Sequence, residues 1–396
     1  MSRTFMHFTR LALAGALTCT STIAMAAPLE LTTFNPTDKG VFPVTSTLIS
    51  GDKDAILVNA QFEGPYANQL IDMVKESGKH LTTIFISYSD PDYYFGLDKL
   101  KKAFPDAHIV ATPQTAYVID ASKQAKLATW KPTLGENAPA SLLTPSPYTQ
   151  DSLTLDGHTI QIKKSKQDPL HSFLWIPSLK TIIDGNSLAQ GGHLWLADTD
   201  GITGINAWIK RLDTMASLHP DKVIPSHYLE KDESPDLIQQ NRDYLVTFKK
   251  AFTSSSDAAQ VVTTMKKAYP QLADTQSLEM GAKVLKHEME WQVFKPYPPI
   301  GYTAREDIGK HRYNLAFKDN HSVTISDGSH DHAANAETVH YTAEEVSPHV
   351  FKLSWHSSTT GNTVVEVENF NNGKVWRTVV AGNGRVSDHP GSIDIL

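Results

Sequence analysis

Residues 82–96, TTIFISYSDPDYYFG, decide the fold prediction because they pass from a strand to a polar loop and then to a helix. The strand, residues 82–87, ends shortly before Asp90-Pro91-Asp92 breaks the extended pattern. In open α/β sheets, ligands bind in the crevice beyond the carboxyl ends of the strands, so two carboxylates and three tyrosines in this turn predict a functional site. The alternative is that this segment is an Asx-Pro turn that happens to be acidic and has no functional role. The apolar positions of the following helix are Leu97, Leu100 and Phe104.

The first 26 residues have the pattern of a secretory signal. Arg3 and Arg10 provide positive charge, residues 11–24 are weakly apolar, and Ala24-Met25-Ala26 is a small-x-small cleavage pattern. The apolar run is shorter than the roughly 20 residues that span a bilayer. We therefore expect cleavage after Ala26 and a periplasmic or secreted protein with no membrane insertion after cleavage.

Composition restricts the chemistry of the mature chain. The single cysteine, Cys19, lies inside the signal, which excludes disulfides, thiolate zinc sites and cysteine nucleophiles after cleavage. Removing Arg3 and Arg10 leaves 34 basic residues against 43 acidic ones, a net charge of −9. This balance argues against nucleic acid and anionic membranes as partners. A small-molecule ligand or substrate remains, and the oligomeric state stays open.

The chain length favours two domains, because one hydrophobic core rarely organises so many residues. Strands and helices alternate from residue 29 onward, and each half begins with hairpins before strands and helices follow. This order predicts a four-layer αββα sandwich over residues 27–293, with a helical tail at about 234–285. Residues 294–301, FKPYPPIG, contain three prolines and predict a linker.

The remaining segment, residues 302–396, has a different pattern of short strands separated by turns rich in Asp, Asn and Gly. Strands at this spacing predict a small antiparallel barrel or sandwich, and we adopt the barrel. The six expected strands are residues 313–317, 322–325, 338–342, 350–355, 363–367 and 374–380.

The first domain resembles the metallo-β-lactamase fold superfamily over residues 29 to about 285. In active members, the loop after the strand that corresponds to residues 82–87 reads His-x-His-x-Asp-His and is followed by a glycine. Gly96 fixes that frame here, and the four positions hold Tyr88, Asp90, Asp92 and Tyr93. The resemblance therefore implies a metal-binding loop in which only the aspartate at position 92 is kept.

The other ligand positions implied by the resemblance are altered as well. A histidine expected near Gln167 is absent, and Asp168 and His171 are the nearest donors. The bridging aspartate is Asn186, whereas the last histidine of the pattern is present as His227. The aspartate common at the end of the strand at residues 55–58 is Asn59.

Donor chemistry limits which metal such a site would hold. A dinuclear zinc centre needs about six protein donors, and a phenol with a pKa of ~10 is a poor replacement for imidazole. An asparagine carbonyl does not bridge two cations as a carboxylate does. We expect either no functional metal or one divalent ion, Zn²⁺ or Mn²⁺. Its ligands would be Asp90, Asp92, His227 and His171, and the alternative role of His171 is to cap the end of a strand.

His193 lies in a glycine-flanked loop after Asn186. It would either point into the same crevice and support the site together with Asn186, or be an ordinary loop histidine. The pair His330 and His332 has metal-binding spacing but lies in a polar, turn-rich loop, which favours solvent exposure.

The second domain is similar to the MoaF-type family of small calycin-like barrels. Its matching segments include Gly309-Lys310 with Tyr313 and Phe317, residues 337–343 and residues 350–355. The resemblance implies a barrel whose interior holds a small ligand and assigns no catalytic residues. The aromatic side chains of the barrel would line such an interior or simply pack its core.

Two functions follow as hypotheses. The first is an exported hydrolase-like protein acting on a small ester or lactone, with Asp92, Tyr93 and Tyr88 as its catalytic groups. The alternative is a non-catalytic periplasmic protein that binds a small molecule. A role in molybdenum-cofactor biology rests on the family analogy alone and conflicts with a secretory signal.

Overall fold

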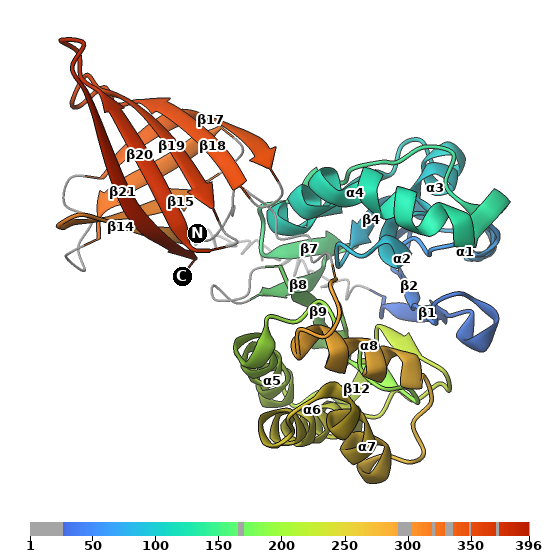
Figure 1. Ribbon diagram of the computed structural model, residues 1–396. Helices are drawn as coiled ribbons and strands as arrows, with labels where there is room; N and C mark the ends of the chain where they lie inside the picture. Colours follow the sequence, from blue (N-terminus) through green and yellow to red (C-terminus); the bar gives the residue numbers. More distant parts are fainter. Residues whose placement is uncertain are drawn as a thin grey trace, which may run out of the picture.

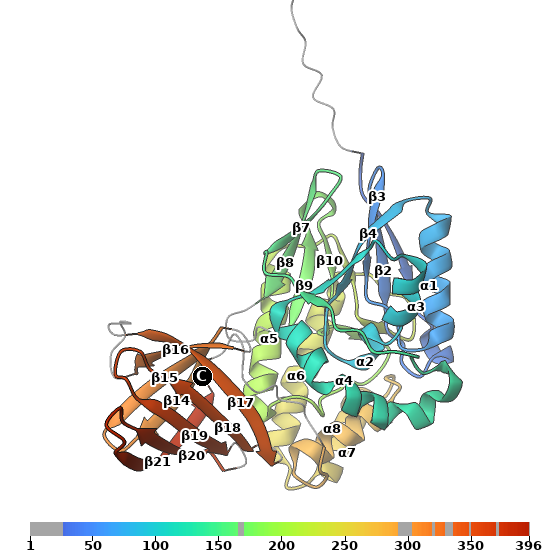
Figure 2. The same ribbon diagram turned by 90° about the horizontal axis from the view of Figure 1, so that it is seen from above.

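The computed structural model describes residues 27–164, 170–291, 303–318, 321–328, 336–347, 350–369 and 372–395. The predicted signal, the predicted linker, Gln167, Asp168 and the pair His330 and His332 lie outside the described residues. Figures 1 and 2 show a layered unit of sheets and helices and a separate barrel formed by the end of the chain.

The first sheet has six strands in the order β1-β2-β3-β4-β5-β6. The first three strands are antiparallel neighbours, and β3 to β6 run parallel. Helices α1, α3 and α4 cover its outer face (Figure 1). The bounds are β1 (Glu30–Phe34), β2 (Ser46–Ser50), β3 (Asp54–Val58), β4 (His80–Ile86), β5 (His108–Ala111), β6 (Ser146–Pro147), α1 (Gly64–Glu76), α2 (Pro91–Tyr94), α3 (Leu97–Ala103) and α4 (Pro113–Leu134).

The second sheet has five strands in the order β12-β10-β9-β8-β7, and helices α5 to α8 pack against its outer side. A two-stranded sheet pairs β11 with β13. In the described part of the chain, no helix has both the length and the apolar character that crossing a membrane requires. The bounds are β7 (Ser152–Leu155), β8 (His158–Lys164), β9 (Ser172–Ile176), β10 (Thr181–Ile183), β11 (Ala189–Gln190), β12 (Lys222–Ile224), β13 (His227–Tyr228), α5 (Gly201–Ser217), α6 (Asp236–Ser254), α7 (Ala258–Ala268) and α8 (Thr275–Leu285).

Strand alternation produces the layers. On β3, Leu57 packs with the helices of the first half, whereas Ile56 and Val58 pack between the two sheets. Leu174 of β9 belongs to the same inter-sheet core, and the neighbouring Phe173 packs with helices α5 to α8. Successive strand side chains point to opposite faces, so each sheet buries both faces. Three cores between four layers confirm the predicted αββα sandwich.

The end of the chain forms a closed antiparallel barrel of strands β14 to β21. Because the barrel is closed, its first and last strands pair with each other and no edge is left unpaired. Of the two predicted forms, barrel or sandwich, the barrel is therefore the one that forms. The six expected strands are present, but the prediction missed the first and the last. The bounds are β14 (Thr303–Ile308), β15 (His311–Phe317), β16 (Ser322–Asp327), β17 (Glu337–Ser347), β18 (Val350–His356), β19 (Thr363–Asn369), β20 (Lys374–Val380) and β21 (Val386–Ile395).

Candidate functional site

The loop after β4 is fixed against the end of β3. The Gly96 amide donates to the Gln61 carbonyl oxygen at 2.9 Å, and the Ala60 amide donates to the Tyr93 carbonyl oxygen at 2.7 Å. A Cβ at Gly96 would lie 2.1 Å from the Ala60 carbonyl oxygen, so this close approach requires glycine. Asn59 also holds the start of this loop by hydrogen bonds, because its Oδ1 accepts from the Ser87 amide at 3.0 Å and from the Ser87 hydroxyl at 2.8 Å.

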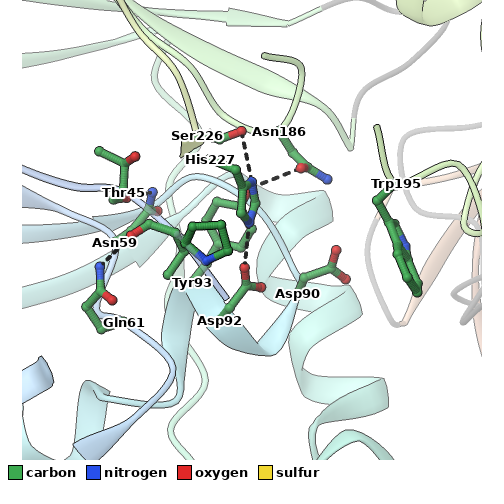
Figure 3. Close-up of polar contacts among 12 residues, drawn as sticks. Thr45, Asn59, Gln61, Asp90, Asp92, Tyr93, Asn186, Trp195, Ser226 and His227 are labelled. Atoms are coloured by element: carbon green, nitrogen blue, oxygen red, sulfur yellow. Dashed lines mark hydrogen bonds and ion pairs between the residues drawn. The ribbon is translucent and has the colours of Figure 1, made fainter. Parts of the chain in front are cut away.

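Asp92 and His227 form the centre of the site (Figure 3). His227 Nε2 lies 2.9 Å from Asp92 Oδ2, although the two residues come from opposite halves of the sandwich. Asp92 is 5% exposed, whereas the His227 side chain is 24% exposed. Burial raises the pKa of Asp92, and the hydrogen bond from His227 opposes that rise. The carboxylate therefore orients an imidazole whose outer part reaches solvent.

Tyr93 connects this pair to Asn186. Its hydroxyl donates to Asn186 Oδ1 at 3.0 Å, and its ring lies edge-on to the His227 ring at 5.8 Å between centroids. Burial, with the negative charge of Asp92, holds the pKa of Tyr93 well above its usual value, so the phenol stays protonated. With Oδ1 bonded to Tyr93, the Asn186 amide nitrogen points toward the side of the site where Trp195 lies (Figure 3).

Asp90 is paired with a cation from the protein itself. Lys126 of α4 places its Nζ 3.1 Å from Asp90 Oδ1 and 2.7 Å from the Ser89 carbonyl oxygen. The Lys126 side chain is only 11% exposed. This lysine was not among the predicted site residues, because a lysine within a predicted helix normally points to solvent.

Tyr88 and His171 lie together beside the central pair. Their rings stack with 4.8 Å between centroids, and Tyr88 also contacts the Tyr93 ring edge-on at 5.8 Å. The structure thus gives His171 an aromatic partner next to the site.

His193 does not join the group, which corrects the supporting role considered for it. Its Nδ1 lies 3.0 Å from the Tyr244 hydroxyl of α6, and its amide donates to the Ala273 carbonyl oxygen at 3.0 Å. These contacts place the side chain in the core of the second half, where burial lowers its pKa.

Ser226 and Asp184 form a buried layer beneath His227 that the sequence analysis missed. The Ser226 hydroxyl donates to the Leu188 carbonyl oxygen at 2.9 Å and lies 3.3 Å from His227 Nδ1. Asp184 accepts from the Ser187 and Leu188 amides at 2.7 and 2.6 Å, and burial raises its pKa. The contacts run from Ser226 through His227 to Asp92. Because Ser226 is only 3% exposed, its hydroxyl positions His227 and is not placed to attack a substrate as a nucleophile.

Asp198 is a further, partly buried acid near this region. Its carboxylate accepts from the indole nitrogens of Trp195 at 2.5 Å and Trp291 at 2.7 Å. Burial, with the negative charge of Asp90, raises the pKa of Asp198 to about 6.

The side chains at the ligand positions do not fit the metal centre that the fold resemblance implies. Lys126 already neutralises Asp90, His227 bonds directly to Asp92, and Tyr93 bonds to Asn186. Among the residues that the structure describes, three metal-binding side chains converge at Glu306, Glu366 and Glu368 in the barrel, and no such trio forms around Asp92. The expected ion at Asp90, Asp92, His227 and His171 therefore lacks a converging donor set.

Comparisons with known proteins identify both parts of the chain. Residues 40–227 match the family model of the metallo-beta-lactamase superfamily, and residues 300–394 match the MoaF-like model. The uncharacterized protein YobT of Bacillus subtilis (strain 168) is 22% identical over 200 residues, which span 50% of this chain and 82% of YobT.

Solved structures of similar proteins include a beta-lactamase domain protein from Burkholderia ambifaria, with 13% identity and a TM-score of 0.48 over 65% of this chain and 84% of that one. A metallo-beta-lactamase family protein from Thermus thermophilus has 12% identity and a TM-score of 0.46 over 65% of this chain and 91% of that one. The chain therefore carries a segment that matches the metallo-beta-lactamase superfamily, followed by a C-terminal segment that matches the MoaF-like model.

Proposed function

We propose that the first domain hydrolyses a small ester or lactone with an acid-base pair instead of the metal centre common in its superfamily. The observation that carries this proposal is the 2.9 Å contact between buried Asp92 and partly exposed His227. Members of the superfamily often bind divalent metals, but the side chains around Asp92 bond to one another and to Lys126. No step of the proposed reaction passes through a metal.

His227 is the general base in this proposal. Its Nε2–H donates to Asp92, which leaves the lone pair on Nδ1. The Ser226 hydroxyl lies 3.3 Å from Nδ1 but donates its hydrogen to the Leu188 carbonyl oxygen, so it does not take up that lone pair. Nδ1 takes a proton from water while the water oxygen bonds to the substrate carbonyl carbon and the carbonyl becomes an oxyanion. The oxyanion then re-forms the carbonyl, the bond to the alkoxide breaks, and the alkoxide takes the proton from His227. Asp92 stabilises the imidazolium between these steps.

Asn186 supplies a hydrogen bond to the developing oxyanion. Tyr93 fixes the orientation of the amide by bonding to its oxygen, so the amide nitrogen is the donor. Tyr93 is then a positioning residue, although it was predicted from the sequence as one of the catalytic groups. Tyr88 packs against Tyr93 and His171 and keeps this wall of the site in place.

The test is a panel of small esters and lactones assayed with the wild-type protein and with His227→Gln and Asp92→Asn. We expect both variants to lose about 100-fold or more in kcat/KM, since general-base catalysis contributes roughly that much. Wild-type activity should persist after treatment with a chelator. The matched control is His80→Gln, because His80 and Asp54 form a similar 3.1 Å pair on the surface.

The possible outcomes separate the alternatives. Activity that survives in both site variants would remove the proposed roles. Activity that a chelator abolishes and Zn²⁺ or Mn²⁺ restores would replace the acid-base pair with a metal site. If the protein binds a small molecule without turning it over, and circular dichroism shows that it is folded, the non-catalytic periplasmic binding protein is favoured.

We also propose that the chain is exported and that its signal ends at Ala26. The support is the charge and apolar pattern of residues 1–26. Amino-terminal sequencing of the protein purified from a periplasmic or secreted fraction should begin at Ala27. A chain that starts at Met1 and stays with the cytoplasmic fraction would contradict this proposal.

A further inference from the structure

Three glutamates and one arginine point into the closed barrel among apolar and aromatic side chains. Glu306 of β14 and Glu366 and Glu368 of β19 have no exposed surface. Arg377 of β20 is 6% exposed and is the cross-strand partner of Glu366. With all four ionised, three negative charges face one positive charge, and these side chains carry a net charge of −2. Such an imbalance is costly in a buried site unless a further cation is bound or protons neutralise the carboxylates.

Arg377 uses only one oxygen of each glutamate that it bonds. Its Nη2 donates to Glu306 Oε2 at 2.6 Å, and its Nε donates to Glu366 Oε1. The remaining oxygens, Glu306 Oε1 and Glu366 Oε2, are buried and have no hydrogen-bond partner among the described residues. One carboxylate oxygen from each of Glu306, Glu366 and Glu368 lies within 4.8 Å of the others. The cluster therefore combines converging acceptors with two oxygens that the described residues do not satisfy.

The charges and contacts of the cluster decide which class of ligand would suit it. The Arg377 guanidinium lies 4.0 Å from the centre of the Tyr313 ring and 5.7 Å from that of Trp355, so aromatic rings take up its remaining faces. An anionic ligand would add to the negative charge, and an apolar one would leave the carboxylate oxygens of Glu306 and Glu366 unpaired. A small cation would offset the negative charge and would also bond to the unpaired carboxylate oxygens of Glu306 and Glu366.

We propose that the barrel binds one divalent metal cation through Glu306, Glu366 and Glu368. Two positive charges neutralise the net charge of the four side chains. Oxygen-only ligands suit Ca²⁺, Mn²⁺ or Mg²⁺ rather than thiophilic metals. Ca²⁺ binds oxygen at about 2.3–2.6 Å, so two oxygens on one ion lie up to roughly 5 Å apart, which agrees with the spacing of the cluster. This inference does not depend on the proposed hydrolase activity.

The test is calorimetric titration of the full mature protein, stripped of metal, with CaCl₂, MnCl₂ and MgCl₂ in separate experiments. Because the glutamates are buried, each sample is also equilibrated for many hours and assayed for bound metal after gel filtration. We expect one ion per chain. Glu368→Gln should weaken binding by about tenfold or more, because ligand charge sets the affinity of oxygen sites. This substitution keeps both ion pairs of Arg377.

Two variants complete the design. Glu344→Gln is the matched control, since Glu344 is an exposed acid on β17 of the same barrel, and it should bind like the wild type. Glu368→Asp keeps the charge and replaces Glu368→Gln if that variant does not fold; it should weaken binding by shortening the ligand. Failure of the wild type to bind Ca²⁺, Mn²⁺ or Mg²⁺ would overturn the proposal. Equal affinity of the Glu368 variants and the wild type would also overturn it.

Discussion

The Asp92–His227 site and the glutamate cluster of the barrel hold buried carboxylates in two different ways. At the first site each acid has one basic partner, His227 for Asp92 and Lys126 for Asp90. In the barrel, three fully buried glutamates converge beside the guanidinium of Arg377, which pairs with two of them. A balanced pair with a partly exposed base suits proton transfer, whereas an excess of buried negative charge suits a cation. This difference underlies our proposal that metal binding and acid-base chemistry belong to different domains of this chain.

The largest effect should follow from removing the positive charge of Arg377 from the barrel cluster. Arg377→Met leaves the buried Glu306 and Glu366 without the ion pairs they form with it, and breaking a buried ion pair costs about 3–5 kcal/mol of unfolding free energy. Urea denaturation in metal-free buffer measures the change. Arg312→Met is the control, because Arg312 pairs with Asp307 on the surface of the same barrel and should cost no more than about 1 kcal/mol. Similar losses in the two variants would show that the buried cluster carries no special cost.

Asp198 adds a third arrangement to this comparison, a carboxylate whose hydrogen-bond donors are two uncharged indole N–H groups. Its pKa of about 6 in the folded protein exceeds the ordinary value of 3.8, so the folded state retains its proton more strongly. This contribution stabilises the fold below pH 4 and is lost as the pH rises from about 4 to about 6. Asp198→Asn loses one of the two indole hydrogen bonds at every pH, because an amide nitrogen does not accept, but it also removes the buried charge. Its unfolding free energy relative to the wild type should therefore be higher at pH 8 than at pH 4 by roughly 1–3 kcal/mol. Denaturation curves at both pH values measure it, and a gain of equal size at both would contradict the assignment.

A smaller effect should separate a bonded tyrosine from an unbonded one in the site loop. Tyr93→Phe removes the hydrogen bond to Asn186 and should cost about 1 kcal/mol of stability, with a roughly tenfold loss in kcat/KM. Tyr94→Phe is the matched control, because the buried Tyr94 hydroxyl has no hydrogen-bond partner among the described residues. That substitution should be neutral or slightly stabilising. Equal losses in the two variants would argue against a specific role for the Tyr93 hydroxyl.

The sequence predicted the αββα sandwich well because strand and helix periods follow one another clearly in residues 29–285. The frame set by Gly96 also placed Asp92 and Tyr93 correctly near Asn186 and His227, although these residues are far apart in the chain. Lys126 escaped notice because the pattern of its helix does not show that Asp90 lies across from it. Ser226 and Asp184 escaped because a buried polar layer depends on backbone partners that only the fold supplies.

The barrel interior was the least predictable part. Glu306 lies on the same buried face of β14 as Ala304 and Ile308, and Glu366 and Glu368 alternate with Val365 and Val367 on β19. In a sequence, charged residues at alternate positions indicate the solvent face of a strand. Here the same period places the charges inside, and Val367 is 38% exposed instead. The missed strand β14 has the same cause, because its buried glutamate interrupts the expected apolar face.

The most direct test of the division between the two domains is metal binding by Asp92→Asn and Glu368→Gln measured side by side with the wild type. Each full-length protein is stripped of metal, equilibrated with Ca²⁺ or Mn²⁺, and assayed for bound ions per chain. We predict one ion for the wild type and for Asp92→Asn, and a loss of about tenfold or more in affinity for Glu368→Gln. Loss of the ion in Asp92→Asn with full binding in Glu368→Gln would place the metal in the first domain and contradict the account.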